Sequence, residues 1–234
     1  PIPAMWSLMG MTDYSGQSEF YKNGFIETDI TIYPSFKRLF TLLKQIQSHK
    51  IKDGFELQVK DKYKINGKPT AYDLRTISES VENTYYDDLY KDILDEGLFD
   101  YVQSVSGRNL ELPSARTRIV MPGPETKGAS AIHRDGHYYK GRSKYTMPPP
   151  INLHFYPCFD EEVSDQFTYW NGTNRFQPDN VLYDKAISLL GKRTTVRSSN
   201  KSAWLVDTSG LHKACPAASE VGSFRLMYSF KLKT

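Results

Sequence analysis

The sequence Ala131-Ile132-His133-Arg134-Asp135-Gly136 leads from an apolar run into a glycine turn and places an imidazole and a carboxylate two residues apart. In an extended strand, side chains at positions i and i+2 lie on the same face, so His133 and Asp135 can point at one place. A second imidazole, from His212, would complete a set of two histidines and one carboxylate. Such a set occupies one face of an octahedral metal ion and leaves the remaining positions open. The sequence therefore predicts a catalytic metal site with His133, Asp135 and His212 as ligands.

A cationic side chain follows the second histidine along the chain. Arg225 lies in Phe224-Arg225-Leu226, within a strand predicted over residues 224–230. A guanidinium holds a carboxylate through two parallel hydrogen bonds, which suits Arg225 to a small dicarboxylate. If this strand runs beside those that carry the metal ligands, the anion and the metal would share one pocket.

The second half of the chain has the pattern of an all-β fold. From residue 116 onwards, short strands alternate with glycine, proline and asparagine turns. We predict strands over residues 117–121, 130–133, 151–156, 167–170, 203–207 and 224–230. A helix is predicted from Asp179 to Gly191, with an inner side formed by Val181, Leu182, Ala186, Leu189 and Leu190. This order predicts a double-stranded β-helix (a jelly-roll, cupin-like barrel) over residues 116–234 as the catalytic core.

The first half, residues 1–115, combines helices with a hairpin. Pro34 is suited to the first turn of a helix, and an apolar stripe follows it. The stripe comprises Phe36, Leu39, Phe40, Leu42, Leu43 and Ile46. Asn66-Gly67 predicts a tight turn that pairs the strand before it with residues 69–74. We expect a single domain over residues 1–234, mainly β with flanking helices (α+β), in which the N-terminal portion is a helical buttress on the barrel.

The composition argues against several classes of protein. The 234 residues carry 30 basic and 27 acidic side chains, a net charge of +3, with only short basic clusters where a nucleic-acid binder would have a stripe. Two cysteines, Cys158 and Cys215, are too few for a disulfide scaffold and suit a reducing compartment. No apolar run is long enough to span a bilayer, and the first residues lack a secretory signal. We expect a cytoplasmic protein without a membrane partner.

The order His133-x-Asp135, His212 and Arg225 resembles that of the Fe(II)/2-oxoglutarate-dependent dioxygenases. Within that superfamily, the stretches 204–212, 224–226 and 152–155 are most similar to the aspartyl/asparaginyl β-hydroxylase-like branch. The resemblance covers about residues 116–231. It implies Fe(II) and 2-oxoglutarate as cofactors and O2 as co-substrate. It also implies hydroxylation of a small molecule or of an amino-acid or peptide side chain, with succinate and CO2 as co-products.

The resemblance also assigns roles to residues of the predicted pocket. Arg225 would bind the distal carboxylate of 2-oxoglutarate, and His154 would contact the carboxylate that chelates the metal. Asn152 stands where that branch has an arginine, and Met227 where the superfamily has a serine. A hydroxyl for the cosubstrate would then come from Tyr145 or Thr117. The long interval between Asp135 and His212 implies an insertion over about residues 160–200.

A basic, aromatic segment directly follows the metal motif, over residues 138–145. It reads either as a lid that contacts an anionic or aromatic substrate or as an exposed loop without a role. The candidate substrate-facing residues of this region are His137, Tyr139, Arg142 and Tyr145.

Three other functions could use the same residues. His133-Arg134-Asp135 spells the catalytic-loop motif of protein kinases, but Lys140 stands where the motif needs asparagine, and the glycine-rich loop is missing. A zinc-dependent hydrolase could use the same His/Asp/His cluster, but it leaves Arg225 without a task. A jelly-roll binding module without catalysis would have surface histidines and an ordinary ion pair at Arg225.

Overall fold

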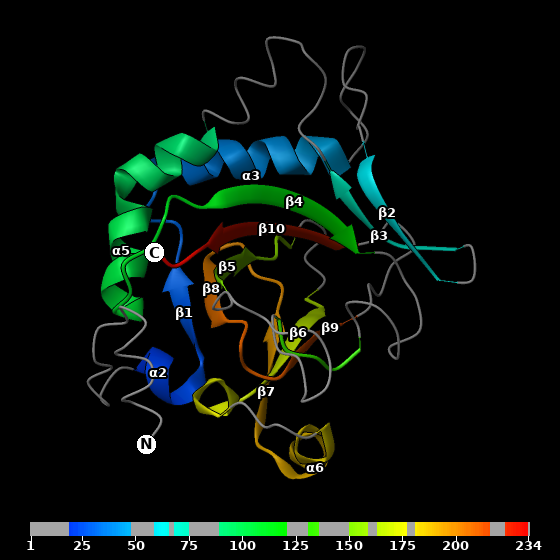
Figure 1. Ribbon diagram of the computed structural model, residues 1–234. Helices are drawn as coiled ribbons and strands as arrows, with labels where there is room; N and C mark the ends of the chain where they lie inside the picture. The colour runs from blue at the N-terminus through cyan, green and yellow to red at the C-terminus, as the bar shows by residue number, and fades with distance from the viewer. Residues whose placement is uncertain are drawn as a thin grey trace.

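The computed structural model describes residues 19–47, 59–65, 68–74, 89–120, 131–135, 150–158, 163–176, 181–215 and 223–233. These residues form two antiparallel sheets, with helices along the outer side of the larger one (Figure 1). In sheet order, the large sheet consists of β1 (Phe25–Asp29), β8 (Ser202–Asp207), β5 (Ile151–Phe155), β10 (Ser223–Phe230), β4 (Ser114–Val120), β3 (Lys68–Leu74) and β2 (Val59–Ile65). The small sheet consists of β7 (Arg193–Arg197), β6 (Asp165–Trp170) and β9 (His212–Ala214).

Helices cover the outer face of the large sheet. α3 (Pro34–Gln47) lies along it, and α5 (Phe99–Ser106) lies near the edge formed by β1 (Figure 1). Because side chains alternate along a strand, Ile151, Leu153 and Phe155 of β5 share this face and join the main apolar core. The ring of Phe36 in α3 meets that of Phe155 edge to face, with centroids 4.7 Å apart and planes at 88°.

Other helical segments lie before β1 or between later strands along the chain. α2 (Glu19–Asn23) precedes β1, and η3 (Thr173–Arg175) is a 3-10 turn after β6. Residues 89–93 are helical and continue through the π-helical turn η1 (Leu94–Leu98) into α5. α6 (Val181–Leu190) lies at the end of the molecule farthest from α3 (Figure 1).

The inner face of the large sheet packs on the small sheet. Phe25 of β1 and Val206 of β8 form one apolar cluster with Phe167 and Tyr169 of β6. Elsewhere on the same inner face, polar side chains replace the apolar ones. These are Asn152 and His154 of β5 with Arg225 and Ser229 of β10, and they are also buried. The space between the sheets therefore has an apolar part and a polar part.

Several predicted elements are confirmed. α3 begins at Pro34 and buries Phe36, Leu39 and Leu43 of the predicted stripe. β2 and β3 pair antiparallel with Ile65 opposite Lys68. The predicted turn at residues 66–67 lies outside the described residues. The strands predicted at 117–121, 151–156, 167–170, 203–207 and 224–230 correspond to β4, β5, β6, β8 and β10.

Two predictions about the β half are wrong. No strand is formed by the described residues 131–133, where His133 makes an isolated bridge to His212 instead. The region 160–200 is more than an insertion, because it supplies β6 and β7, two of the three strands of the small sheet.

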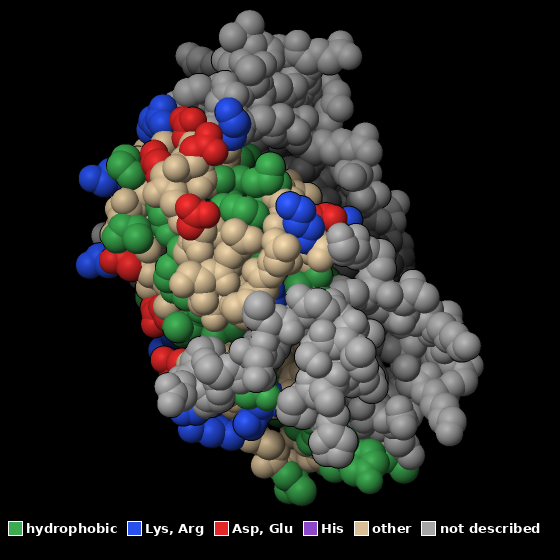
Figure 2. Space-filling model, turned by 60° about the vertical axis from the view of Figure 1, so that its left-hand side comes forward, with side chains coloured by type: hydrophobic (Ala, Val, Ile, Leu, Met, Phe, Trp, Pro, Cys, Tyr) green, Lys and Arg blue, Asp and Glu red, His purple; other side chains and the backbone are tan. Residues whose placement is uncertain are grey.

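The predicted inner side of α6 is also wrong. Leu182, Leu189 and Leu190 are 62%, 83% and 89% exposed. Hydrophobic side chains lie at the lower end of the molecule in Figure 2, where Figure 1 places α6. The buried residue of this helix is Asp184, which pairs with Arg134. A buried ion pair, and not an apolar stripe, thus sets which side of α6 faces inward.

The described surface carries side chains of both charges, and both cysteines are thiols. On the face in Figure 2, basic and acidic side chains lie near one another along the edge of the described surface. Cys158 and Cys215 are thiols. Among the described residues, no helix has both the length and the apolar character needed to cross a bilayer.

Candidate metal centre

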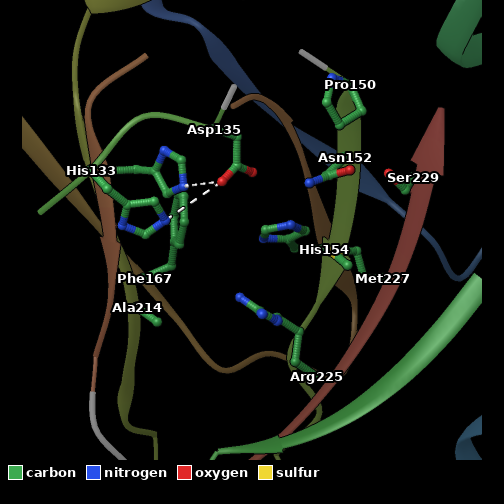
Figure 3. A pocket seen from close by; sticks show the side chains of 11 residues that line it. His133, Asp135, Pro150, Asn152, His154, Phe167, Ala214, Arg225, Met227 and Ser229 are labelled. Carbon is green, nitrogen blue, oxygen red and sulfur yellow. Dashed lines mark ion pairs between the residues drawn. The ribbon is translucent and has the colours of Figure 1, made fainter. Parts of the chain in front are cut away.

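Three potential metal ligands converge between the sheets. Nε2 of His133 lies 3.6 Å from Oδ1 of Asp135, and Nε2 of His212 lies 4.0 Å from the same oxygen (Figure 3). The ligand atoms of all three residues lie within 4.8 Å of one another. Two nitrogens and one carboxylate, from residues far apart along the chain, thus lie around a common point.

Main-chain hydrogen bonds hold the segment 131–135 against β9. The backbone nitrogens of His133 and His212 each donate to the other's carbonyl oxygen at 2.9 Å. The backbone nitrogen of Asp135 donates to the carbonyl of Thr208, also at 2.9 Å. The relative position of the three side chains is therefore fixed by the backbone, although His133 and Asp135 are partly exposed.

Both histidines present the same ring nitrogen to the cluster. Nδ1 of His133 lies 2.7 Å from the carbonyl oxygen of Ala131, and Nδ1 of His212 lies 2.8 Å from that of Gly210. A carbonyl oxygen can only accept a hydrogen bond, so each Nδ1 carries the hydrogen. The lone pair of each neutral ring is then on Nε2, which faces the cluster. Such an outer partner fixes the tautomer and the orientation of a metal-binding histidine.

The imidazole of His212 is buried among aromatic rings. Phe167 lies 5.3 Å from it between centroids, and Tyr169 lies parallel to it at 6.5 Å. Burial and the neighbouring His133 lower the pKa of His212 to about 4, although the carboxylate of Asp135 acts in the opposite direction. His212 is therefore neutral near pH 7, which is the form that binds a metal.

A cavity of about 220 Å³ opens from these ligands into the space between the sheets (Figure 3). It is lined by His133, Asp135, Pro150, Asn152, His154, Phe167, His212, Ala214, Arg225, Met227 and Ser229. The cavity therefore fits a small polar ligand beside the metal ligands.

The side of the cavity opposite His133 and His212 carries buried polar groups. Arg225 is 6% exposed and Asn152 is 4% exposed. Within the described part of the chain, neither Nε of Arg225 nor Oδ1 of Asn152 has a hydrogen-bond partner. Nδ1 of His154 lies 2.9 Å from the hydroxyl of Tyr156. A buried polar group without a partner costs free energy, so this side of the cavity is suited to a polar ligand.

The candidate residues thus fall into two groups. His133, Asp135, His212, Arg225, His154 and Asn152 line one cavity. His137, Tyr139, Arg142 and Tyr145 lie outside the described residues, as does the side chain of Thr117.

Arg134 and Ser229 were missed by the sequence analysis. Ser229 lines the cavity on the same strand face as Arg225, four positions on. Arg134 lies between two of the metal ligands but forms a buried ion pair with Asp184. The alternation that places His133 and Asp135 together also predicts that Arg134 points the other way, and that signal was available.

Comparison with known proteins supports the fold. No protein-family model matches the chain, and no curated protein matches its sequence. The chain is similar to SnoN, a non-heme α-ketoglutarate-dependent epimerase from nogalamycin biosynthesis, at 10% identity, with a TM-score of 0.59 over 99% of this chain and 82% of SnoN. HygX from Streptomyces hygroscopicus, solved with nickel and 2-oxoglutarate bound, is 12% identical, with a TM-score of 0.56 over 92% of this chain and 85% of HygX.

EvdMO1 is a third similar structure, at 16% identity with a TM-score of 0.58 over 92% of this chain. The chain spans only 49% of the length of EvdMO1. At such identities the likeness concerns the fold alone. A mixed α/β fold with antiparallel sheets, of the kind found in these enzymes, is thereby confirmed.

Proposed function

We propose that this protein is an Fe(II)- and 2-oxoglutarate-dependent oxygenase. The observation that carries the proposal is the convergence of His133, Asp135 and His212 in a cavity that also contains the buried guanidinium of Arg225. Two neutral imidazoles and one carboxylate suit a ferrous ion, because they leave half of its coordination positions open. When bound, the ion together with 2-oxoglutarate and O2 supplies the oxidising chemistry and yields succinate and CO2.

The protein side chains bind and orient in this proposal. Nε2 of His133, Nε2 of His212 and the carboxylate of Asp135 hold the metal. Arg225 binds the distal carboxylate of 2-oxoglutarate, because it is the cationic group on the opposite wall of the same cavity (Figure 3). His154 and Asn152 lie on the neighbouring strand and contact the other end of the cosubstrate. Ser229 lines the same cavity, on the strand face that carries Arg225.

The cofactors agree with those of similar structures. HygX has been solved with nickel and 2-oxoglutarate, and SnoN is described as α-ketoglutarate dependent. SnoN is an epimerase, so one fold serves more than one oxidative outcome. For this protein, we propose hydroxylation of a small molecule or of an amino-acid or peptide side chain. We also propose that it belongs to the aspartyl/asparaginyl β-hydroxylase-like branch.

The proposal also includes the organisation and location of the protein. Residues before and after position 116 share one sheet, because β1, β2 and β3 join β5, β8 and β10. This supports a single domain. The thiols of Cys158 and Cys215 support a reducing, cytoplasmic setting.

The test is formation of succinate from 2-oxoglutarate without added substrate. Purified protein with Fe(II), 2-oxoglutarate and O2 should form succinate slowly, and His133→Ala and His212→Ala should abolish it. A binding module would form none. A zinc-dependent hydrolase would copurify with zinc and would show no dependence on oxygen. Either result would overturn the proposed function.

A further inference from the structure

Arg134 points away from the two proposed ligands that flank it, and its guanidinium is fully engaged. Its side chain is 1% exposed, and that of its partner Asp184 is 5% exposed. Nε donates to both carboxylate oxygens of Asp184, at 3.1 and 2.9 Å, and Nη2 donates to one of them at 2.8 Å. Nη1 donates to the carbonyl oxygens of Thr173 at 2.7 Å and Ser209 at 2.8 Å. All three guanidinium nitrogens are therefore used within the protein.

These bonds connect Arg134 to three separate segments: α6 through Asp184, η3 through Thr173, and the turn after β8 through Ser209. That turn also provides the carbonyl of Gly210, which orients the ring of His212. Oγ1 of Thr173 in turn accepts from the backbone nitrogen of Leu211, next to His212, at 2.8 Å. The guanidinium thus ties the segment that carries His133 and Asp135 to the segment that carries His212.

We propose that Arg134 is the positioning residue of the metal centre and that, with Asp184, it sets the affinity for the metal. This inference rests on the proposed function. The planar guanidinium holds two carbonyls and a carboxylate in one fixed arrangement, which a lysine ammonium cannot reproduce. Arg134 lies between His133 and Asp135 along the chain, so anchoring its side chain in the protein also holds the backbone from which these two ligands project. Asp184 is the buried residue of α6, so the ion pair anchors the inner side of this helix.

Two variants separate positioning from stability. Arg134→Met combined with Asp184→Leu removes both charges, which leaves no charge buried alone, and such replacements are often tolerated. Arg134→Lys keeps the positive charge but loses the planar guanidinium with its several hydrogen-bond donors. Leu39→Ala is the matched control, because it opens the core beneath α3, far from the ligands, and lowers stability without touching them.

The experiment is titration of each metal-free protein with Co(II), followed by visible absorption at a temperature where all variants are folded. Wild type should bind one Co(II), and His133→Ala should not bind it. The double variant should bind about 10–100-fold more weakly with an altered spectrum. Arg134→Lys should recover part of the affinity, and Leu39→Ala should match wild type.

Wild-type affinity and spectrum in the double variant would overturn the role of Arg134 and leave the metal centre intact. An equal loss of affinity in Leu39→Ala would also overturn it, since any loss of stability would then suffice. Failure of wild type itself to bind Co(II) would overturn the proposed function, and this inference with it.

Discussion

The ring of Tyr169 stacks against the imidazole of His212, with planes 6° apart and centroids at 6.5 Å. Its hydroxyl donates to the carbonyl oxygen of Asp207 at 2.9 Å, which fixes the ring in place. The same hydroxyl lies close to the backbone of Gly210, whose carbonyl orients His212. Tyr169 therefore supports His212 and Gly210 from behind, and it does not line the cavity.

Gly210→Ala should disturb the packing between Gly210 and the ring of Tyr169. A Cβ at position 210 would lie 1.7 Å from the hydroxyl oxygen of Tyr169 and 2.4 Å from its Cζ, and the ring is fully buried. We expect a loss of about 1–3 kcal/mol in the free energy of unfolding, measured by urea denaturation, as for other overpacked cores. Tyr169→Phe in the Gly210→Ala background should recover part of it, because the nearest atom is removed. Wild-type stability for Gly210→Ala alone would contradict this packing.

Arg225→Lys should weaken the use of 2-oxoglutarate without affecting the metal. The ammonium keeps the charge but cannot make two parallel hydrogen bonds to a carboxylate. The concentration of 2-oxoglutarate needed for half-maximal succinate formation should rise at least about tenfold, while Co(II) affinity stays unchanged. Arg197→Lys, in an exposed ion pair with Asp165, is the control and should behave as wild type. Loss of metal in Arg225→Lys would show that its assigned role is wrong.

Removal of Arg108 should destabilise the protein much more than removal of an exposed arginine. Nη2 of Arg108 lies 2.6 Å from Asp207, and both side chains are buried. Arg108→Met leaves that carboxylate without its buried counter-charge, which costs about 3–5 kcal/mol. Arg38→Met breaks the exposed pair with Asp92 and should cost only about 0–1 kcal/mol. Equal chemical-denaturation midpoints for the two variants would contradict the burial of the Arg108 pair.

The metal-free protein should lose stability on acidification through His212. Its pKa falls from 6.5 to about 4 on folding, so between these values the unfolded state binds the proton and the folded state does not. The contribution of His212 is thus fully present above about pH 6.5 and declines as the pH falls towards 4. In EDTA, His212→Phe should reduce the slope of unfolding free energy against pH in this window. An unchanged slope would show that His212 is not held neutral.

The sequence predicts those features that depend on local periodicity. The i, i+2 spacing of His133 and Asp135 and the stripe of α3 are of this kind, and both describe the structure. The orientation of α6 is not predictable in this way, because Asp184 turns inward to meet Arg134, 50 residues away. The spacing of the apolar residues in α6 predicts a buried side that is in fact exposed. Ser229 is likewise not predictable from the serine position of the superfamily, because Met227 occupies that position and Ser229 lies two residues further along β10.

The most direct test of the metal centre is binding of 2-oxoglutarate under anaerobic conditions, by calorimetry, with and without Fe(II). Wild type should bind 2-oxoglutarate much more tightly when Fe(II) is present. His212→Ala should lose this dependence on the metal. Equal affinity for 2-oxoglutarate with and without Fe(II) in the wild-type protein would contradict a shared site for the metal and the dicarboxylate.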